Sequence, residues 1–258
     1  MIIVAGGDSF IYGSELADCN DSHSLSTFTA LLAQGCDYQC VAWPGSANNS
    51  IARAVMTQCE ANQGPQGVIV SWTFPSRYEF KFTYDTGQRT GEWYSISPWT
   101  VREDVTSIRE EFKEFNQSIF NDQVASLNRA KKTGIYDFAK MFYSHVGSSE
   151  YWEIYSSLKE LVFLQNYLKL KQIPYLFTCA DNTLFDNYTV QHMDRTIKGL
   201  INQVDMSKWC LFDNKGFYQW SVDNKYRIGT THPLEQAHAD AALLMKDKFN
   251  ELVKKHLQ

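Results

Sequence analysis

Met1-Ile2-Ile3-Val4-Ala5-Gly6-Gly7-Asp8-Ser9-Phe10 opens the chain and decides its fold. Five apolar residues lead into two glycines, and a polar Asp-Ser pair follows directly. An apolar run of this length that ends in a turn signal is typical of a buried strand. It is too short for the core of a signal peptide, and no Lys or Arg precedes it. The opening therefore predicts a first strand with a polar turn at its carboxyl end.

Outward from this stretch, further apolar runs alternate with helical patterns. The runs that predict strands are 2–5, 38–43, 67–73, 173–179 and a short one at 209–212. The patterns that predict helices are 24–33, 48–60, 197–204 and 234–252, with Pro233 in the first turn of the last helix. Strands that alternate with helices predict an α/β fold, a three-layer α/β/α sandwich with a mostly parallel sheet. An α+β fold with an antiparallel sheet is the alternative.

The middle of the chain departs from this alternation. Residues 78–99 are polar and aromatic, which favours a hairpin or an ordered lid. Apolar residues then recur at helical spacing over 105–127 and 151–168. We therefore predict a single domain, residues 1–258, with an aromatic lid and a helical insertion at about 75–172, between the third and fourth strands.

Composition excludes several classes of protein. The 258 residues are 44% hydrophobic and 21% charged, which is ordinary for a globular chain and not for a disordered one. The net charge of -5 gives no basic face, so we expect no nucleic-acid partner. No apolar stretch is long enough to cross a membrane. Six dispersed cysteines predict reduced thiols, and the lack of a signal peptide predicts a cytoplasmic protein, with a virion or another export route as alternatives. No oligomeric state follows from the sequence.

Three short blocks carry residues that can do chemistry. Gly7-Asp8-Ser9 follows the first strand, where parallel sheets gather their sites. Gly45-Ser46-Ala47-Asn48 follows the second strand, and Thr231-His232-Pro233 precedes the last helix. Taken singly, each block also fits a plainer reading, as a turn, a helix cap or a surface histidine.

A metal pair of His232 and His238 is disfavoured because six residues do not return to the same helix face, so we predict no metal and no cofactor.

Together the three blocks resemble the SGNH hydrolase family, also called GDSL esterases and lipases. The resemblance covers roughly residues 1–74 and 173–258 and implies an α/β/α sandwich. It implies that Ser9 is the nucleophile, supported by Gly7 and Asp8, and that His232 is the base. It also implies an oxyanion hole made by the N–H groups of Ser9 and Gly45 together with an asparagine side chain.

Two positions depart from the family pattern. Ser71-Trp72-Thr73-Phe74 stands where the family has Gly-x-Asn-Asp, so the third oxyanion donor is expected to be Asn48 or Thr73, and Arg53 or Arg77 could also line the site. Gly229 stands where the family has the aspartate that orients the base. We expect a main-chain carbonyl to orient His232, with Asp213 or Asp223 as the possible third acid.

The sequence thus predicts a serine hydrolase that cleaves a carboxylic ester, with a small-molecule or glycan ester as its substrate. The aromatic residues of 78–99 could pack a lid or stack on sugar rings, which would favour O-acetyl groups on carbohydrate. The main alternative is a catalytically silent domain of the same fold that binds carbohydrate or serves in an assembly. A flavodoxin-like binding domain would not bring Ser9 near His232 at all.

Overall fold

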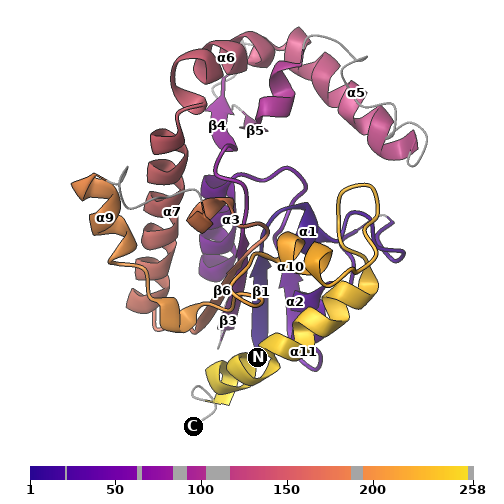
Figure 1. The fold of residues 1–258 in the computed structure, drawn as a ribbon, viewed down its shortest axis with the longest axis vertical. Coiled ribbons are helices and arrows are strands. Elements are labelled where there is room, and N and C mark those ends of the chain that lie inside the picture. The colour runs from indigo at the N-terminus through magenta and orange to yellow at the C-terminus, as the bar shows by residue number, and fades with distance from the viewer. Residues whose placement is uncertain (21, 63–65, 84–91, 103–116, 187–193, 255–258) are drawn as a thin grey trace.

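The chain folds around a four-stranded parallel sheet. The computed structural model describes every residue except 21, 63–65, 84–91, 103–116, 187–193 and 255–258. The strands are β1 (Ile2–Gly6), β2 (Asp37–Cys40), β3 (Gln66–Trp72) and β6 (Tyr175–Cys179), in the spatial order β2-β1-β3-β6. Because all three pairings are parallel, the carboxyl ends of the strands meet at one edge of the sheet (Figure 1). The run predicted at 209–212 forms isolated bridges instead of a strand, a parallel one from Trp209 to Phe177 and an antiparallel one from Phe212 to Lys215.

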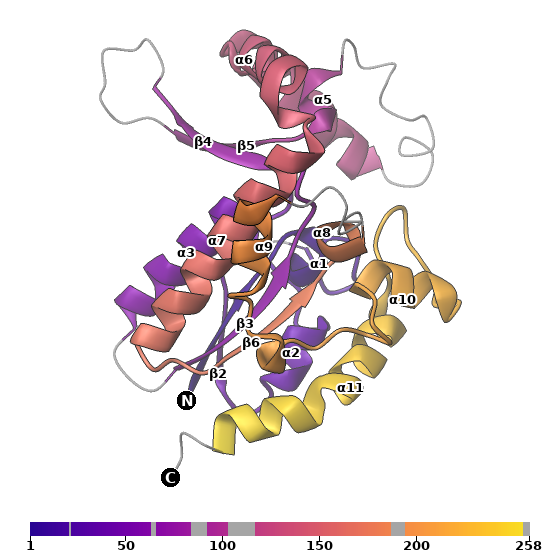
Figure 2. The same cartoon turned by 60° about the vertical axis from the view of Figure 1, so that its left-hand side comes forward.

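Helices cover both faces of this sheet. One face carries α2 (Phe28–Leu32), α10 (Phe217–Asp223) and α11 (Glu235–Lys254), and the other carries α3 (Asn48–Ala61), α7 (Glu150–Leu170) and α9 (Arg195–Ile201) (Figure 2). Successive strand residues enter opposite cores, since Ile3 and Ile69 face the first group of helices whereas Val4 and Val70 face the second. The predicted α/β/α sandwich is therefore confirmed.

The remaining helices and helical turns lie outside these two groups. They are α1 (Ser9–Tyr12), α5 (Gln117–Lys132), α6 (Ile135–Phe142), α8 (Thr183–Asp186), a π-helical turn at Tyr143–Gly147 and 3₁₀ turns at Pro98–Val101 and Met206–Lys208. Capping side chains set several helix starts: Thr27 accepts from the N–H of Ala30 at the start of α2, and Asp194 accepts from Ile197 at the start of α9. The last helix begins at Glu235. Pro233, which was predicted in its first turn, lies two residues before it.

The predicted hairpin lies beyond the carboxyl edge of the sheet. Strands β4 (Tyr78–Phe82) and β5 (Glu92–Ile96) pair antiparallel and pack with α5 and α6 around a small core of their own (Figure 2). The tip of the hairpin and much of the helical pattern predicted over 105–127 lie outside the described residues. By contrast α7, which the sequence assigned to the insertion, packs directly on the sheet and belongs to the sandwich.

Polar contacts tie this hairpin to the sandwich. The side chain of Asn49 in α3 donates to the carbonyl of Glu79 at 2.8 Å and accepts from its N–H at 3.0 Å. Arg53, one turn further along α3, forms two hydrogen bonds with the carboxylate of Glu79, at 2.7 and 2.8 Å. A bidentate arginine pair fixes direction as well as distance. The hairpin is therefore held in a defined position next to the sheet edge that carries Ser9.

All six cysteines are free thiols. Among the described residues, no helix combines the length and the apolar character that a membrane span needs.

Candidate active site

Ser9 and His232 meet at the carboxyl edge of the sheet, although 223 positions separate them in the sequence. The Oγ of Ser9 lies 2.7 Å from the Nε2 of His232, which is hydrogen-bond distance. Both side chains are shielded from solvent, with 8% of Ser9 and 14% of the His232 side chain exposed. The structure thus brings together the serine and the histidine that the sequence singled out.

The turn between β1 and α1 presents Ser9. Asp8 caps α1 by accepting from the N–H of Phe10 at 3.1 Å, so Ser9 becomes the first residue of the helix. The first N–H groups of a helix have no acceptor within it, so the N–H of Ser9 is not used inside α1. The ring of Phe10 packs edge-on against the imidazole of His232, with 4.6 Å between the ring centroids. This contact restricts the tilt of the imidazole.

Glu15 completes a line of three side chains. Its Oε1 lies 2.7 Å from the Nδ1 of His232, and 5% of the Glu15 side chain is exposed. The expectation that a main-chain carbonyl orients the imidazole is therefore wrong, because a carboxylate occupies that place. The two acids considered from the sequence lie elsewhere: Asp223 pairs with Lys215, and Asp213 sits in a turn with a left-handed φ of 51°.

Gly229 explains why the acid comes from position 15. A Cβ atom placed on Gly229 would overlap the Oε2 of Glu15. The absence of a side chain at 229 therefore makes the space that the Glu15 carboxylate fills. The departure from the family pattern at Gly229 is a relocation of the carboxylate rather than its loss.

The Glu15 carboxylate is held by the loop that precedes His232. It accepts from the N–H of Thr230 and, at 3.0 and 2.8 Å, from the N–H and the hydroxyl of Thr231. Burial, the largest single influence, would raise the pKa of Glu15, but the hydrogen bonds from His232, Thr231 and Thr230 together lower it below its ordinary value. Glu15 is therefore ionised at neutral pH. An ionised carboxylate can only accept, so the Nδ1 of His232 carries a proton and its Nε2 is free to accept from Ser9.

The two side chains expected as third oxyanion donors are already committed. The amide of Asn48 donates to the carbonyl of Thr73 at 3.1 Å and to the hydroxyl of Ser157 at 3.0 Å, and its oxygen accepts from the N–H of Thr73 at 2.8 Å. The Thr73 hydroxyl donates its only proton to Asp8, at 2.5 Å, and its oxygen accepts from Arg77. As placed here, neither Asn48 nor Thr73 can donate to a substrate, so both expectations are wrong for this arrangement.

The loop after β2 forms another side of the site. Gly45 adopts a left-handed φ of 79°, a conformation that favours glycine. The N–H of Trp43 donates to the carbonyl of Gly7 at 3.3 Å, which places this loop beside the Ser9 turn. Trp43 is 67% exposed, and its indole makes a T-shaped contact with the ring of Tyr12, with 5.6 Å between the ring centroids.

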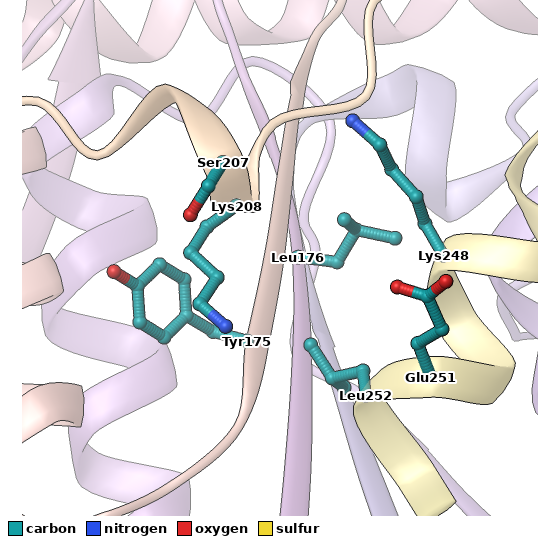
Figure 3. Close-up of a pocket in the computed structure, with 7 residues that line it drawn as sticks. All are labelled: Tyr175, Leu176, Ser207, Lys208, Lys248, Glu251 and Leu252. Atoms are coloured by element: carbon teal, nitrogen blue, oxygen red, sulfur yellow. The ribbon is translucent and has the colours of Figure 1, made fainter. Parts of the chain in front are cut away.

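Hollows in the described part of the surface include one near this site and one far from it. One, of about 170 Å³, runs between α3, β4 and α7 and reaches the site through Arg77 and Asn48. The other, of about 80 Å³, lies at the opposite end of the sheet, where Tyr175 begins β6, and is lined partly by Lys208 and Lys248 (Figure 3). The first hollow is connected to the Ser9 turn through Arg77, which binds Asp8, whereas none of the residues that line the second hollow belongs to the site.

His238 does not join His232 in a metal site. It is 1% exposed, its Nδ1 accepts from the N–H of Phe28 at 3.2 Å, and its ring stacks on Phe28. No cluster of three or more histidine, cysteine or acidic side chains that could hold a metal occurs in the part of the chain that the structure describes.

We predict that His238 makes the fold sensitive to acid. Burial, and then the charge of His232, lower the pKa of His238 from 6.5 to about 3. The unfolded chain therefore binds one proton more than the folded one between pH 6.5 and 3, and this contribution to stability is complete above pH 6.5 and is lost as the pH falls through that window. From pH 7.5 to 5 the term amounts to about 2 kcal/mol.

Urea unfolding at pH 7.5 and pH 5 measures this effect. The control variant is His238→Gln, whose side-chain carbonyl can still accept from Phe28 but which does not titrate. We expect the wild type to lose about 2 kcal/mol more than the variant between the two pH values. Equal losses in both proteins would contradict the prediction.

Sequence reasoning missed Glu15 and gave no defined role to Arg77. No local motif marks Glu15, because its contact with His232 spans 217 positions and depends on the loop between α1 and α2. Arg77 donates to Asp8 at 2.9 Å, whereas Arg53 is bound to Glu79 and does not line the site. An unexplained glycine before the histidine, at 229, was the one available signal that an acid enters from elsewhere.

Comparisons with known proteins return only distant likenesses. No family model matches the sequence, and the search of curated proteins found no match. Among solved structures, the chain is similar to the esterase EstA from Pseudoalteromonas sp., in a structure inhibited by monoethylphosphonate, with 10% identity, 98% of each chain covered and a TM-score of 0.44.

Two further structures are similar at the same level. One is a member of the lipolytic protein G-D-S-L family from Veillonella parvula DSM 2008, with 10% identity, 97% of this chain and 98% of that chain covered and a TM-score of 0.46. The other is a carbohydrate esterase family 2 enzyme with a carbohydrate binding domain from Corynascus thermopiles (Myceliophthora fergusii), with 13% identity, 98% and 66% covered and a TM-score of 0.42. At such values a likeness carries no argument about chemistry, which has to come from the side chains.

Proposed function

We propose that this protein is a serine hydrolase that cleaves carboxylic esters through an acyl-enzyme on Ser9. One observation carries the proposal: Ser9, His232 and Glu15 form a continuous hydrogen-bonded line in which each contact is 2.7 Å. A serine hydroxyl is a weak nucleophile until an adjacent base removes its proton, and the base needs a third group to orient it. All three functions have a side chain here.

The proposed reaction proceeds in two halves. His232 Nε2 takes the proton of Ser9 as Oγ attacks the ester carbon, and it then returns that proton to the departing alcohol. A water molecule, deprotonated in turn by His232, attacks the acyl-enzyme and releases the carboxylic acid and Ser9. Glu15 keeps Nδ1 protonated and stabilises the imidazolium that forms in each half.

Main-chain N–H groups are the proposed donors to the oxyanion. Since Asn48 and Thr73 are committed to other partners, the N–H groups of Ser9 and Gly45 remain from the expected set. Each such donor typically contributes about 10²–10³ in turnover, so these two N–H groups would supply the main stabilisation of the oxyanion.

Covalent labelling with a fluorophosphonate tests the proposed function. The wild-type protein is expected to gain the mass of one phosphonyl group on Ser9 and to lose esterase activity in proportion, whereas Ser9→Ala is expected to remain unlabelled. A folded wild-type protein that neither labels nor hydrolyses activated esters would instead be the silent binding domain.

Within this function, we propose an acetylated carbohydrate as the substrate. The support is Trp43, an exposed indole on the loop that carries Gly45, next to the Ser9 turn. A rigid aromatic face offers apolar contact to a sugar ring. The exposed indoles near the hairpin, by contrast, are partly covered. The guanidinium of Arg53 lies 4.4 Å from the ring centroid of Trp93, and that of Arg102 lies 3.9 Å from the ring centroid of Trp99.

Trp43→Ala is expected to discriminate between substrates. Loss of a stacking contact costs about 0.5–1.5 kcal/mol, so kcat/KM for an acetylated sugar should fall roughly two- to twelvefold. Hydrolysis of ethyl acetate, which has no ring, should change less than twofold. Steady-state kinetics on both esters provides the measurement, and an equal fall for both would contradict the carbohydrate assignment.

A further inference from the structure

The carboxylate of Asp8 is a buried charge directly beside the proposed nucleophile. Asp8 is 0% exposed. Its Oδ1 caps α1 through Phe10, and its Oδ2 accepts from the hydroxyl of Thr73 and from Nη1 of Arg77. Removing the partner of a buried ion leaves a charge without compensation, which is strongly destabilising. The conformation of the turn therefore depends on what binds Oδ2.

Arg77 binds Oδ2 from a fixed position. Its Nη1 bridges Asp8 at 2.9 Å and Thr73 at 3.1 Å, and its guanidinium carbon lies 4.7 Å from the ring centroid of Phe74. The Arg77 side chain is 14% exposed. Thr73 and Phe74 follow β3 directly, whereas Asp8 follows β1. Arg77 thus clamps the carboxyl end of one strand to the nucleophile turn of its neighbour.

A lysine could not reproduce this arrangement. The guanidinium offers five N–H donors in a rigid plane, and its Nη1 donates to two different acceptors here while the group lies over the ring of Phe74. An ammonium group would supply the charge but not the fixed fork. The geometry therefore indicates that Arg77 fixes the position of the Asp8 carboxylate and does not merely neutralise its charge.

From these contacts we infer that Arg77 is a positioning residue of the proposed hydrolase, which acts through Asp8 to hold Ser9 at its attack position. The inference rests on the proposed function of Ser9. Arg77 is not assigned a contact with substrate. Displacing a reacting group by about 1 Å can cost about 10²-fold in rate. Loss of Arg77 should therefore lower kcat and leave KM nearly unchanged.

The test compares Arg77→Met with Arg53→Met. Both variants remove an arginine that pairs with a buried carboxylate, but Arg53 pairs with Glu79 in the hairpin rather than with the Ser9 turn. Active sites are first titrated with the fluorophosphonate, and kcat for an activated ester is then expressed per titrated site. We expect Arg77→Met to lose about 10²-fold with KM within twofold. Arg53→Met should keep its kcat per site even if less of it folds.

Two more variants examine the route through Asp8. Adding Asp8→Asn to Arg77→Met should cost little beyond the larger single effect, because both changes break the same clamp. Arg77→Lys should recover part of the lost kcat. An unchanged kcat per site in Arg77→Met, or fully additive losses in the double variant, would overturn the inference. If the wild type fails to label at Ser9, the proposed function fails first, so the two failures are distinguishable.

Discussion

His232→Ala is expected to lower ester turnover by about 10⁶-fold, because in a serine–histidine unit the loss of the base removes almost all of the activation of the nucleophile. Without an acceptor at 2.7 Å, the Ser9 hydroxyl keeps its proton at neutral pH. The measurement is kcat for an activated aryl acetate, with the unlabelled Ser9→Ala protein as the background rate. The two variants should be equally inactive, since each removes a member of one unit.

The control for this change is His238→Gln. His238 lies in the first turns of α11, the helix that His232 precedes, but its side chain accepts from the N–H of Phe28 and does not contact Ser9. It should therefore retain kcat within about threefold at pH 7.5, where the side chain is uncharged. If His232→Ala kept more than about a hundredth of the wild-type rate with the fold intact by circular dichroism, another group would have to be the base.

Glu15→Gln is expected to cost about 10⁴-fold in kcat, the loss typical when the acid of a triad becomes an amide. The reason lies in the hydrogen-bond donors around it. Thr230, Thr231 and His232 all donate to this carboxylate, so an NH₂ group in its place meets a donor wherever it points. The imidazole would then lose the tautomer in which Nε2 accepts from Ser9. Steady-state kinetics, checked by thermal unfolding, measures the effect.

A relocation of the acid sharpens this prediction. In the double variant Glu15→Ala, Gly229→Asp the new side chain would start in the space that the Glu15 carboxylate vacates. We expect the kcat of this double variant to be roughly tenfold or more above that of Glu15→Ala. Asp213→Asn and Asp223→Asn should leave kcat unchanged. No recovery, together with a large loss from either aspartate variant, would show that Glu15 is not the acid that orients His232.

The fold was predictable because it depends on local patterns. The apolar run at residues 2–5 and the helical stripe over 234–252 each reflect burial on a regular element, and both elements formed where expected. The pairing of Ser9 with His232 was expected from the resemblance to the SGNH hydrolase family, because His232 lies in the loop before α11 and not at the end of a strand.

The rest of the site depends on contacts that no local pattern encodes. Glu15 enters through a loop, and its role follows from space left at Gly229. Asn48 and Thr73 have the right chemistry for oxyanion donors, but a residue type does not reveal whether its protons are already used. Their hydrogen bonds in the structure exclude both as oxyanion donors. Thr73 has one hydroxyl proton and donates it to Asp8, and the amide of Asn48 donates to Thr73 and Ser157.

The distance along the chain between the two halves of the site has a consequence for biosynthesis. Ser9 is synthesised 223 positions before His232, and Glu15 is synthesised 217 positions before it. On the proposed mechanism, a nascent chain carries no competent nucleophile until the segment with His232 has been made and has packed beside Ser9. Ribosome-bound chains halted before residue 229 should accordingly resist the fluorophosphonate, and labelling of such chains at Ser9 would refute this timing.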